Sequence, residues 1–122
     1  MPVNRILILD DEPNIVRSLD FVLKKEGYDV SIADDGDQAL TMIRGSKPNL
    51  LILDVMMPKK NGYDVCREVK SDPALREIYV LILTAKGQEA DLEQGLAQGA
   101  DEFITKPFSP MMIAVRVKEL LG

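Results

Sequence analysis

Short apolar runs recur along the chain and are separated by longer segments of mixed character. Five of these runs have the length and the branched aliphatic content that are typical of β-strands. They cover residues 5–9, 28–33, 50–53, 79–83 and 102–105. The third run is apolar throughout and is bounded by turn signals, which indicates a strand buried on both faces of a sheet.

The segments between the runs follow the period of an amphipathic helix. After the first run, apolar residues recur at helical spacing from Ile15 to Leu23, and Gly27 is expected to end that helix. Pro13 suits its first turn. Further helices are expected at residues 36–45, from the candidate cap Asn61 to 72, from about 89 to 98, and at 109–121.

Strand and helix therefore alternate five times, and this alternation predicts an α/β fold. Helix-length crossovers predict a parallel sheet with right-handed connections and with helices on both faces. We expect five parallel strands in the order 2-1-3-4-5 and five helices, which is the doubly wound, flavodoxin-like arrangement. A chain of 122 residues is expected to form a single domain, 1–122.

Composition and charge exclude several classes of protein. A net charge of -5 argues against nucleic-acid binding by this chain, and the apolar runs are too short to span a membrane. The chain has no histidine, which excludes Ser-His-Asp and Cys-His catalysis and a role as a phosphohistidine carrier. The single cysteine, Cys66, suits a reducing, cytoplasmic location and is expected to pack in the core.

The candidate acidic residues directly follow the first and third runs. Asp10 and Asp11 come after the first run and Asp54 after the third. In the expected strand order these two strands are neighbours, so the three carboxylates meet at the carboxyl edge of the sheet, beside the switch point. Clustered carboxylates repel one another unless a cation lies among them, and oxygen ligands suit Mg²⁺, which keeps waters and accepts a phosphate oxygen.

Two further polar groups reach the same edge. Lys106, after the fifth run, adds an ammonium group, and Thr84, after the fourth, adds a hydroxyl donor. Together with a metal and a carboxylate nucleophile, they suit transfer of a phosphoryl group onto Asp54. Simpler roles stay open. Asp10 could cap a helix, Asp54 could cap the following loop, Lys106 could be a solvated loop charge, and Thr84 could hydrogen-bond to its local backbone.

In these motifs the chain resembles the receiver domains of bacterial two-component response regulators. The matching stretches are Ile8-Leu9-Asp10-Asp11-Glu12, Leu53-Asp54-Val55-Met56-Met57-Pro58 with Gly62, Leu83-Thr84-Ala85, and Gly99-Ala100-Asp101 leading to Lys106-Pro107-Phe108. The resemblance covers the whole chain, and in its C-terminal half it is strongest to receivers of the winged-helix subfamily.

The resemblance implies a phosphoprotein that works in signal transduction or a phosphorelay. Asp54 would accept phosphate from a histidine kinase or a phosphotransfer protein. Asp11, Asp54 and the carbonyl of Met56 would bind Mg²⁺ as the cofactor, with Asp10 acting through water.

The resemblance also assigns a switch. Lys106 would contact the phosphoryl group, and Thr84 would shift toward it. Phe103 stands at the family's switch aromatic, although a fixed core residue is the alternative. The peptide bond between Lys106 and Pro107 would be cis.

An output face is expected on the fourth helix, fifth strand and fifth helix, where winged-helix receivers pair through charges. Charges of suitable sign for a phosphorylation-dependent homodimer are Asp101, Glu102, Arg116 and Lys118. Helical spacing also predicts a partly apolar patch on this face, made by Leu92, Met111, Met112 and Val115. Scattered surface apolar residues are the alternative.

The preferred interpretation is a signalling switch rather than an enzyme. Such a switch catalyses only its own phosphoryl transfer and autodephosphorylation. A haloacid-dehalogenase-type phosphatase would also use Asp, Thr, Lys and Mg²⁺, but it needs an Asp-x-Asp arrangement on the first strand and a cap. A flavodoxin-type cofactor binder would need a glycine- and hydroxyl-rich loop where this chain has Asp10-Asp11-Glu12-Pro13. A receiver fold used only for docking is a further alternative.

Overall fold

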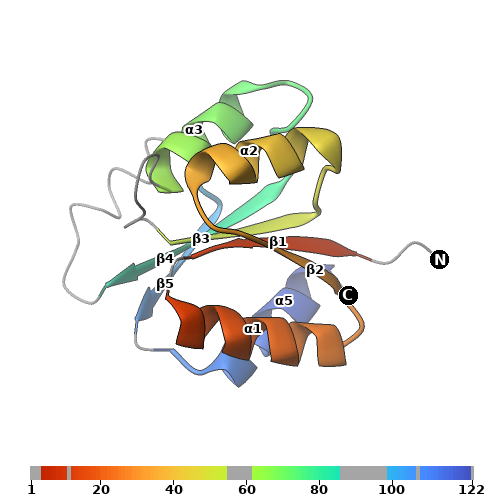
Figure 1. The fold of residues 1–122 in the computed structure, drawn as a ribbon, viewed down its shortest axis with the longest axis vertical. Coiled ribbons are helices and arrows are strands. Elements are labelled where there is room, and N and C mark those ends of the chain that lie inside the picture. Colours follow the sequence, from red (N-terminus) through yellow and green to blue (C-terminus); the bar gives the residue numbers. More distant parts are fainter. Residues whose placement is uncertain (1–3, 11, 55–61, 86–98, 107, 122) are drawn as a thin grey trace.

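The protein is an α/β sandwich built on one parallel sheet (Figure 1). The computed structural model describes residues 4–10, 12–54, 62–85, 99–106 and 108–121. The strands are β1 (Arg5–Leu9), β2 (Asp29–Ala33), β3 (Leu50–Asp54), β4 (Tyr79–Ala85) and β5 (Glu102–Lys106). They lie in the order β2-β1-β3-β4-β5 with every pair parallel, so the predicted sheet is confirmed.

Two helical layers cover the sheet. Helices α1 (Pro13–Lys25) and α5 (Pro110–Leu121) lie on one face, and α2 (Gly36–Gly45) and α3 (Gly62–Ser71) lie on the other (Figure 1). The described residues thus contain four of the five expected helices. The fifth, expected at about 89–98, lies outside them, as does the candidate cap Asn61.

Local chemistry explains where α1 begins and ends and where α2 begins. Pro13 stands in the first turn of α1, and Gly27 follows the helix with φ 94°, a conformation that glycine adopts without steric cost. Asp35 caps α2, because its carboxylate accepts a hydrogen bond of 2.8 Å from the backbone N–H of Gln38.

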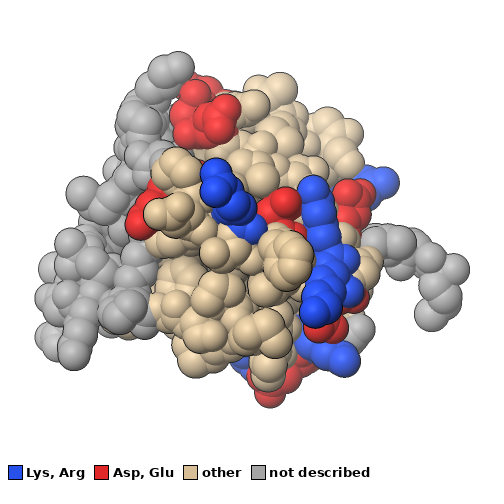
Figure 2. All heavy atoms as spheres, turned by 60° about the horizontal axis from the view of Figure 1, so that its bottom comes forward, with Lys and Arg blue, Asp and Glu red and all other residues tan. Residues whose placement is uncertain are grey.

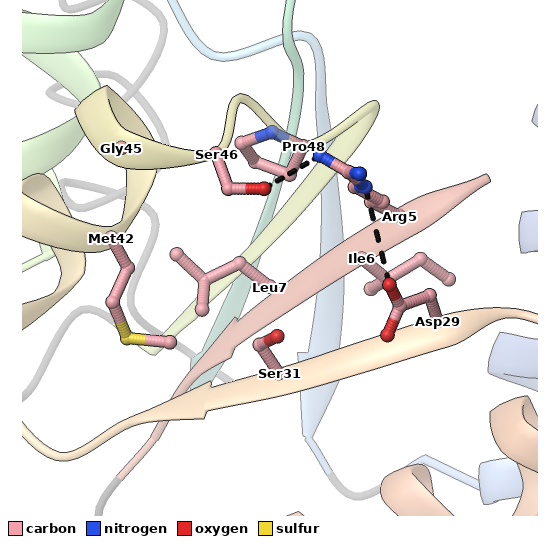
Figure 3. Close-up of a pocket in the computed structure, with 9 residues that line it drawn as sticks. All are labelled: Arg5, Ile6, Leu7, Asp29, Ser31, Met42, Gly45, Ser46 and Pro48. Atoms are coloured by element: carbon pink, nitrogen blue, oxygen red, sulfur yellow. Dashed lines mark hydrogen bonds and ion pairs between the residues drawn. The ribbon is translucent and has the colours of Figure 1, made fainter. Parts of the chain in front are cut away.

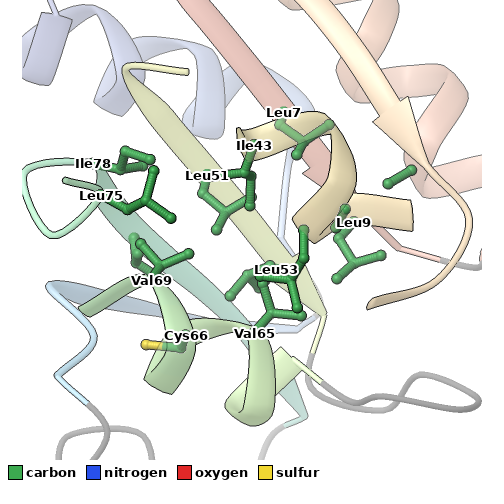
Figure 4. Packing of buried hydrophobic residues seen from close by; sticks show 14 of the residues in the cluster. Leu7, Leu9, Ile43, Leu51, Leu53, Val65, Cys66, Val69, Leu75 and Ile78 are labelled. Atoms are coloured by element: carbon green, nitrogen blue, oxygen red, sulfur yellow. The ribbon is translucent and has the colours of Figure 1, made fainter. Parts of the chain in front are cut away.

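The strands contribute side chains to two separate apolar layers, since alternate side chains point to opposite faces of a sheet. Leu7, Leu9, Leu51 and Leu53 pack with α2 and α3, as Figure 4 shows. The residues at the alternating positions, among them Ile6, Ile8, Leu50 and Ile52, pack with α1 and α5. Burial on both faces is the reason why the central strands are apolar throughout.

Three strands run further than the sequence pattern predicted. β3 includes Asp54, β4 continues through Thr84 to Ala85, and β5 continues to Lys106. The apolar pattern ends earlier because these residues lie at the edge of the core, whereas backbone hydrogen bonding between strands does not depend on an apolar side chain. Apart from Ala85, the extra residues are those expected to carry chemistry.

Candidate functional site

The register of the sheet brings the candidate residues to one edge. Leu9 pairs with Leu53, so Asp10 and Asp54 follow paired residues on adjacent strands. On the other side of β3, Asp54 pairs with Leu83, which directly precedes Thr84. Ala85, the residue after Thr84, pairs with Lys106. Four strands therefore end with their candidate polar residues at the carboxyl edge of the sheet.

Asp10 is the site carboxylate whose surroundings the structure describes. The residue is 3% exposed, and its Oδ1 accepts a hydrogen bond of 2.9 Å from the backbone N–H of Glu12, the residue directly before α1. This contact supports part of the simpler interpretation, in which Asp10 orders the start of the helix. It leaves Asp10 held rigidly against the end of β1, as a site carboxylate would need to be.

Other predicted site residues lie partly or wholly outside the described part of the chain. Asp11, Met56 and Pro107 are outside it, and of Asp54, Thr84 and Lys106 it describes the backbone. Within the residues it does describe, no group of three acidic, histidine or cysteine side chains could hold a metal. The oxygen donors expected at this edge suit a hard cation, so Mg²⁺ binding stays a prediction.

Phe103 lies on β5, opposite Ile82 of β4, and is half-buried. It packs against the apolar layer under α2 and α3. Partial burial on an edge strand is compatible with the predicted switch role. The alternative, a fixed core residue, stays open as well.

The exposed side of the first half of α5 is apolar. Met111 is 59% exposed, Met112 51% and Val115 58%, whereas Ile113 and Val117 face the core. Their outward positions agree with the helical spacing of the sequence. Leu92, the fourth expected member of this patch, lies outside the described residues.

Charges expected on the output face pair within the chain. The guanidinium of Arg116 donates three hydrogen bonds to the carboxylate of Glu102: Nε donates to Oε1 at 3.0 Å and to Oε2 at 2.7 Å, and Nη2 donates to Oε1. The Tyr79 hydroxyl donates to the same carboxylate at 2.8 Å. Hydrogen bonding from Arg116 lowers the pKa of Glu102, while burial and the hydrogen bond to Glu102 raise the pKa of Tyr79. This cluster ties β4, β5 and α5 together.

Asp101 is engaged in a second cluster. Its Oδ2 lies 2.6 Å from the Lys70 ammonium, and it accepts a hydrogen bond of 2.8 Å from the backbone N–H of Val80. Lys70 also donates to the carbonyls of Ile78 and Arg76 at 2.7 and 3.1 Å. Sequence reasoning missed Lys70 and Tyr79, because an isolated lysine on a helix and a strand tyrosine carry no signal for such partners.

The hollows on the described surface include the following two. One, the α1–β2 groove, has a volume of about 470 Å³ and is lined by Asp10, Pro13, Val16, Arg17, Asp20, Ile32 and Asp34. The other, of about 260 Å³, lies at the amino ends of β1 and β2, where Arg5 contacts Ser46 and Asp29 (Figure 3). Only the first adjoins the edge that carries Asp10.

Comparisons with known proteins agree with this geometry. Residues 6–118 match the response regulator receiver domain family. The chain is 45% identical over 117 residues, 96% of its length, to the alkaline phosphatase synthesis transcriptional regulatory protein PhoP of Bacillus subtilis, of which it covers 48%. It is 45% identical over 123 residues, 99% of its length, to the probable transcriptional regulator ycf27 of Cyanophora paradoxa, of which it covers 50%.

A solved structure shows the same fold. The crystal structure of a putative response regulator from Chloroflexus aurantiacus superimposes with a TM-score of 0.91 at 35% identity, and the match covers 98% of both chains. The chain spans about half the length of the curated relatives that it matches. Among the helices of the described segments, none is long and apolar enough to cross a bilayer.

Proposed function

Because the chain belongs to the response regulator receiver domain family, we propose that it is a phosphorylation-operated switch whose acceptor is Asp54. The observation that carries this proposal is the sheet register. In this register, β1, β3, β4 and β5 all end at one edge of the sheet. The buried Asp10 directly follows β1 there, and β1 pairs with β3, the strand that carries Asp54. Receiver domains act as phosphorylation-dependent switches that control an output, and this edge supplies the residues for that role.

The phosphoryl donor is a histidine kinase or a phosphotransfer protein. An oxygen of Asp54 attacks phosphorus, the bond from phosphorus to the donor's imidazole nitrogen breaks, and an acyl phosphate forms. Asp11, Asp54 and the Met56 carbonyl would hold Mg²⁺, with Asp10 acting through water. The metal supplies positive charge that offsets the charge of the phosphoryl oxygens and of the clustered carboxylates.

Residues of β4 and β5 sense the phosphoryl group. The Lys106 ammonium contacts one of its oxygens, and the Thr84 hydroxyl moves toward another. This position of Thr84 leaves room for Phe103 to turn inward, so phosphorylation shifts a pre-existing balance between two arrangements of the face formed by β5 and α5. The chain hydrolyses its own acyl phosphate slowly and turns over no other substrate, which makes it a switch rather than an enzyme.

Phosphorylation without a kinase tests the acceptor. Acetyl phosphate with Mg²⁺ is expected to add a single phosphoryl group to the wild type, measured by intact-protein mass spectrometry. Asp54→Asn should add none, and chelating the metal should prevent labelling of the wild type. Asp72→Asn, a change of the same kind at a partly exposed position in the turn after α3, is the matched control and should label normally. Equal labelling of Asp54→Asn and the wild type would overturn the assignment.

The output of the switch is a phosphorylation-dependent association of two copies through the face that contains β5 and α5. Figure 2 turns the layer of α1 and α5 toward the viewer, and a broad area of it carries neither acidic nor basic side chains. Since Glu102 and Arg116 pair within the chain, the exposed Met111, Met112 and Val115 are left to supply much of the contact.

A charge-introducing double variant tests this surface. Met111→Glu with Val115→Glu is expected to keep the protein monomeric in the presence of beryllofluoride and Mg²⁺, whereas the wild type associates, as measured by light scattering after gel filtration. Both side chains are exposed, so the fold should survive. Phe21→Glu, at a 66% exposed position of α1, is the matched control and should associate like the wild type. Association of the double variant would remove the proposal.

Two broader expectations belong to the same proposal. Residues 1–122 form one domain, and this domain works in the cytoplasm with no nucleic-acid contact of its own. The DNA binding or transcriptional regulation named for the relatives is a property of proteins about twice as long. Support comes from the net charge of -5, which disfavours contact with a phosphate backbone.

A further inference from the structure

The α1–β2 groove has a chemical character that the proposed switch does not use. Its volume of about 470 Å³ falls in the range of ligand sites, roughly 300–1,000 Å³. One wall comes from α1, with Pro13, Val16, Arg17 and Asp20. The other comes from β2 and the residue after it, with Ile32 and Asp34. The groove is therefore built by two elements that hold its shape.

The floor of the groove is apolar. Ile32 is 36% exposed although it points to the same face of the sheet as the buried Val30. It is exposed because β2 is the edge strand of the sheet, so no further described strand extends the layer beyond it. Val16 lies opposite on α1 and packs against the core beneath. An occupant with an aliphatic part would remove this apolar surface from water.

The rim of the groove is acidic. The carboxylates of Asp20 and Asp34 stand there with the guanidinium of Arg17, and the buried carboxylate of Asp10 lines the groove below them. The Asp20 carboxylate lies 3.1 Å from the ammonium of Lys24, one helical turn further on. Such a surface pair on a helix contributes about 0.5 kcal/mol or less, so another cation can replace it. The rim therefore favours a positively charged occupant over a neutral or acidic one.

We propose that the α1–β2 groove receives a lysine or arginine side chain from a partner protein. These side chains combine a methylene stem with a charged head, so the stem covers Val16 and Ile32 while the head lies among the carboxylates. Asp10 belongs both to the groove and to the acidic edge of the sheet, so this contact places the partner directly beside the phosphorylation site. The charge complementarity selects a basic partner segment.

Titration of the intact chain with a model peptide tests the proposal. The probe is acetyl-Gly-Arg-Gly-amide, followed by the methyl NMR signals of Val16 and Ile32. We expect saturable shifts with this peptide and about fivefold weaker binding of the citrulline peptide, which has the same shape without the charge. No metal or phosphoryl donor is present, so the result is independent of the proposed phosphorylation. Equal binding of the two peptides would overturn the proposal.

Matched variants locate the binding. Asp20→Asn with Asp34→Asn should weaken binding of the arginine peptide about fivefold, since it removes two rim charges. Glu77→Gln with Glu119→Gln removes two charges outside the groove, at side chains that are 85% and 60% exposed, and should bind like the wild type. Thermal unfolding verifies that both variants fold. Equal weakening by both pairs would show a general charge effect and contradict the assigned site.

Discussion

At the scale of single residues, burial sets the chemistry of Cys66. Its side chain is fully buried in the layer under α2 and α3. Burial raises the pKa of the thiol from 9.0 to about 11, with Lys70 opposing the shift and Asp101 adding to it. The folded chain therefore keeps this thiol protonated at a pH where the unfolded chain has lost the proton.

This difference in pKa predicts a pH-dependent stability. The contribution of the Cys66 thiol to the free energy of unfolding is fully present below pH 9. It is lost as the pH rises toward about 11, because the folded form binds the proton more tightly than the unfolded form. The Cys66→Ala variant has no group to ionise at this position. Its loss of core packing lowers the free energy of unfolding by an amount that does not depend on pH. The stability advantage of the wild type over Cys66→Ala should shrink by about 2 kcal/mol over this range, measured by urea unfolding. A constant difference would contradict the buried thiol.

Residue roles were predictable where periodicity alone determines them. Cys66 was expected in the core, and Met111 and Val115 on the surface, from helical spacing, and the structure confirms all three positions. Lys70 was not predictable, because its role depends on meeting Asp101 and two carbonyl groups from other elements. A pattern within one element carries no information about partners from another.

At the scale of the elements, the start of β5 depends on a close approach to α3. Gly99 has φ 93°, and a Cβ at this position would lie 3.1 Å from both Cβ and Cγ of Lys70. The Lys70 stem cannot move aside freely, since its ammonium is held by three acceptors. Gly27, after α1, has a similar φ of 94° but no atom within 4 Å of such a Cβ.

Comparing an alanine substitution at each of the two glycines therefore distinguishes the cost of backbone strain from the cost of steric crowding. Gly27→Ala is expected to cost about 1 kcal/mol of unfolding free energy from strain alone. Gly99→Ala should cost roughly 1 kcal/mol more, because Lys70 must shift as well. Urea unfolding of the two variants beside the wild type measures both values. Equal losses would mean that the contact between Gly99 and Lys70 does not constrain the entry into β5.

The types and order of the elements were predictable, but their ends were not. Alternation of apolar runs and helical segments identified each described strand and helix. Strands β3, β4 and β5 were expected to stop one or two residues early, because polar residues interrupt the apolar pattern at Asp54, Thr84 and Lys106. At this edge the strands continue through residues that are proposed to hold the phosphoryl group rather than through core residues.

At the scale of the whole molecule, the strand order joins residues that are far apart in the sequence. Asp10 follows β1 and Asp54 ends the neighbouring strand β3, and Thr84 and Lys106 lie on the next two strands along. The convergence of these positions was predictable from the alternation of elements together with the handedness of parallel crossovers. The α1–β2 groove was not predictable, because it depends on how α1 sits against an edge strand.

The central claim is that this edge binds a phosphoryl group on Asp54 with a divalent cation beside it. A crystal structure of the protein with Mg²⁺ and beryllofluoride tests it most directly. The expected result is beryllofluoride on the Asp54 carboxylate, with Mg²⁺ bound by Asp11, Asp54 and the Met56 carbonyl, and with Lys106 and Thr84 contacting the fluorides. Beryllofluoride bound elsewhere, or Lys106 out of reach of the group on Asp54, would contradict it.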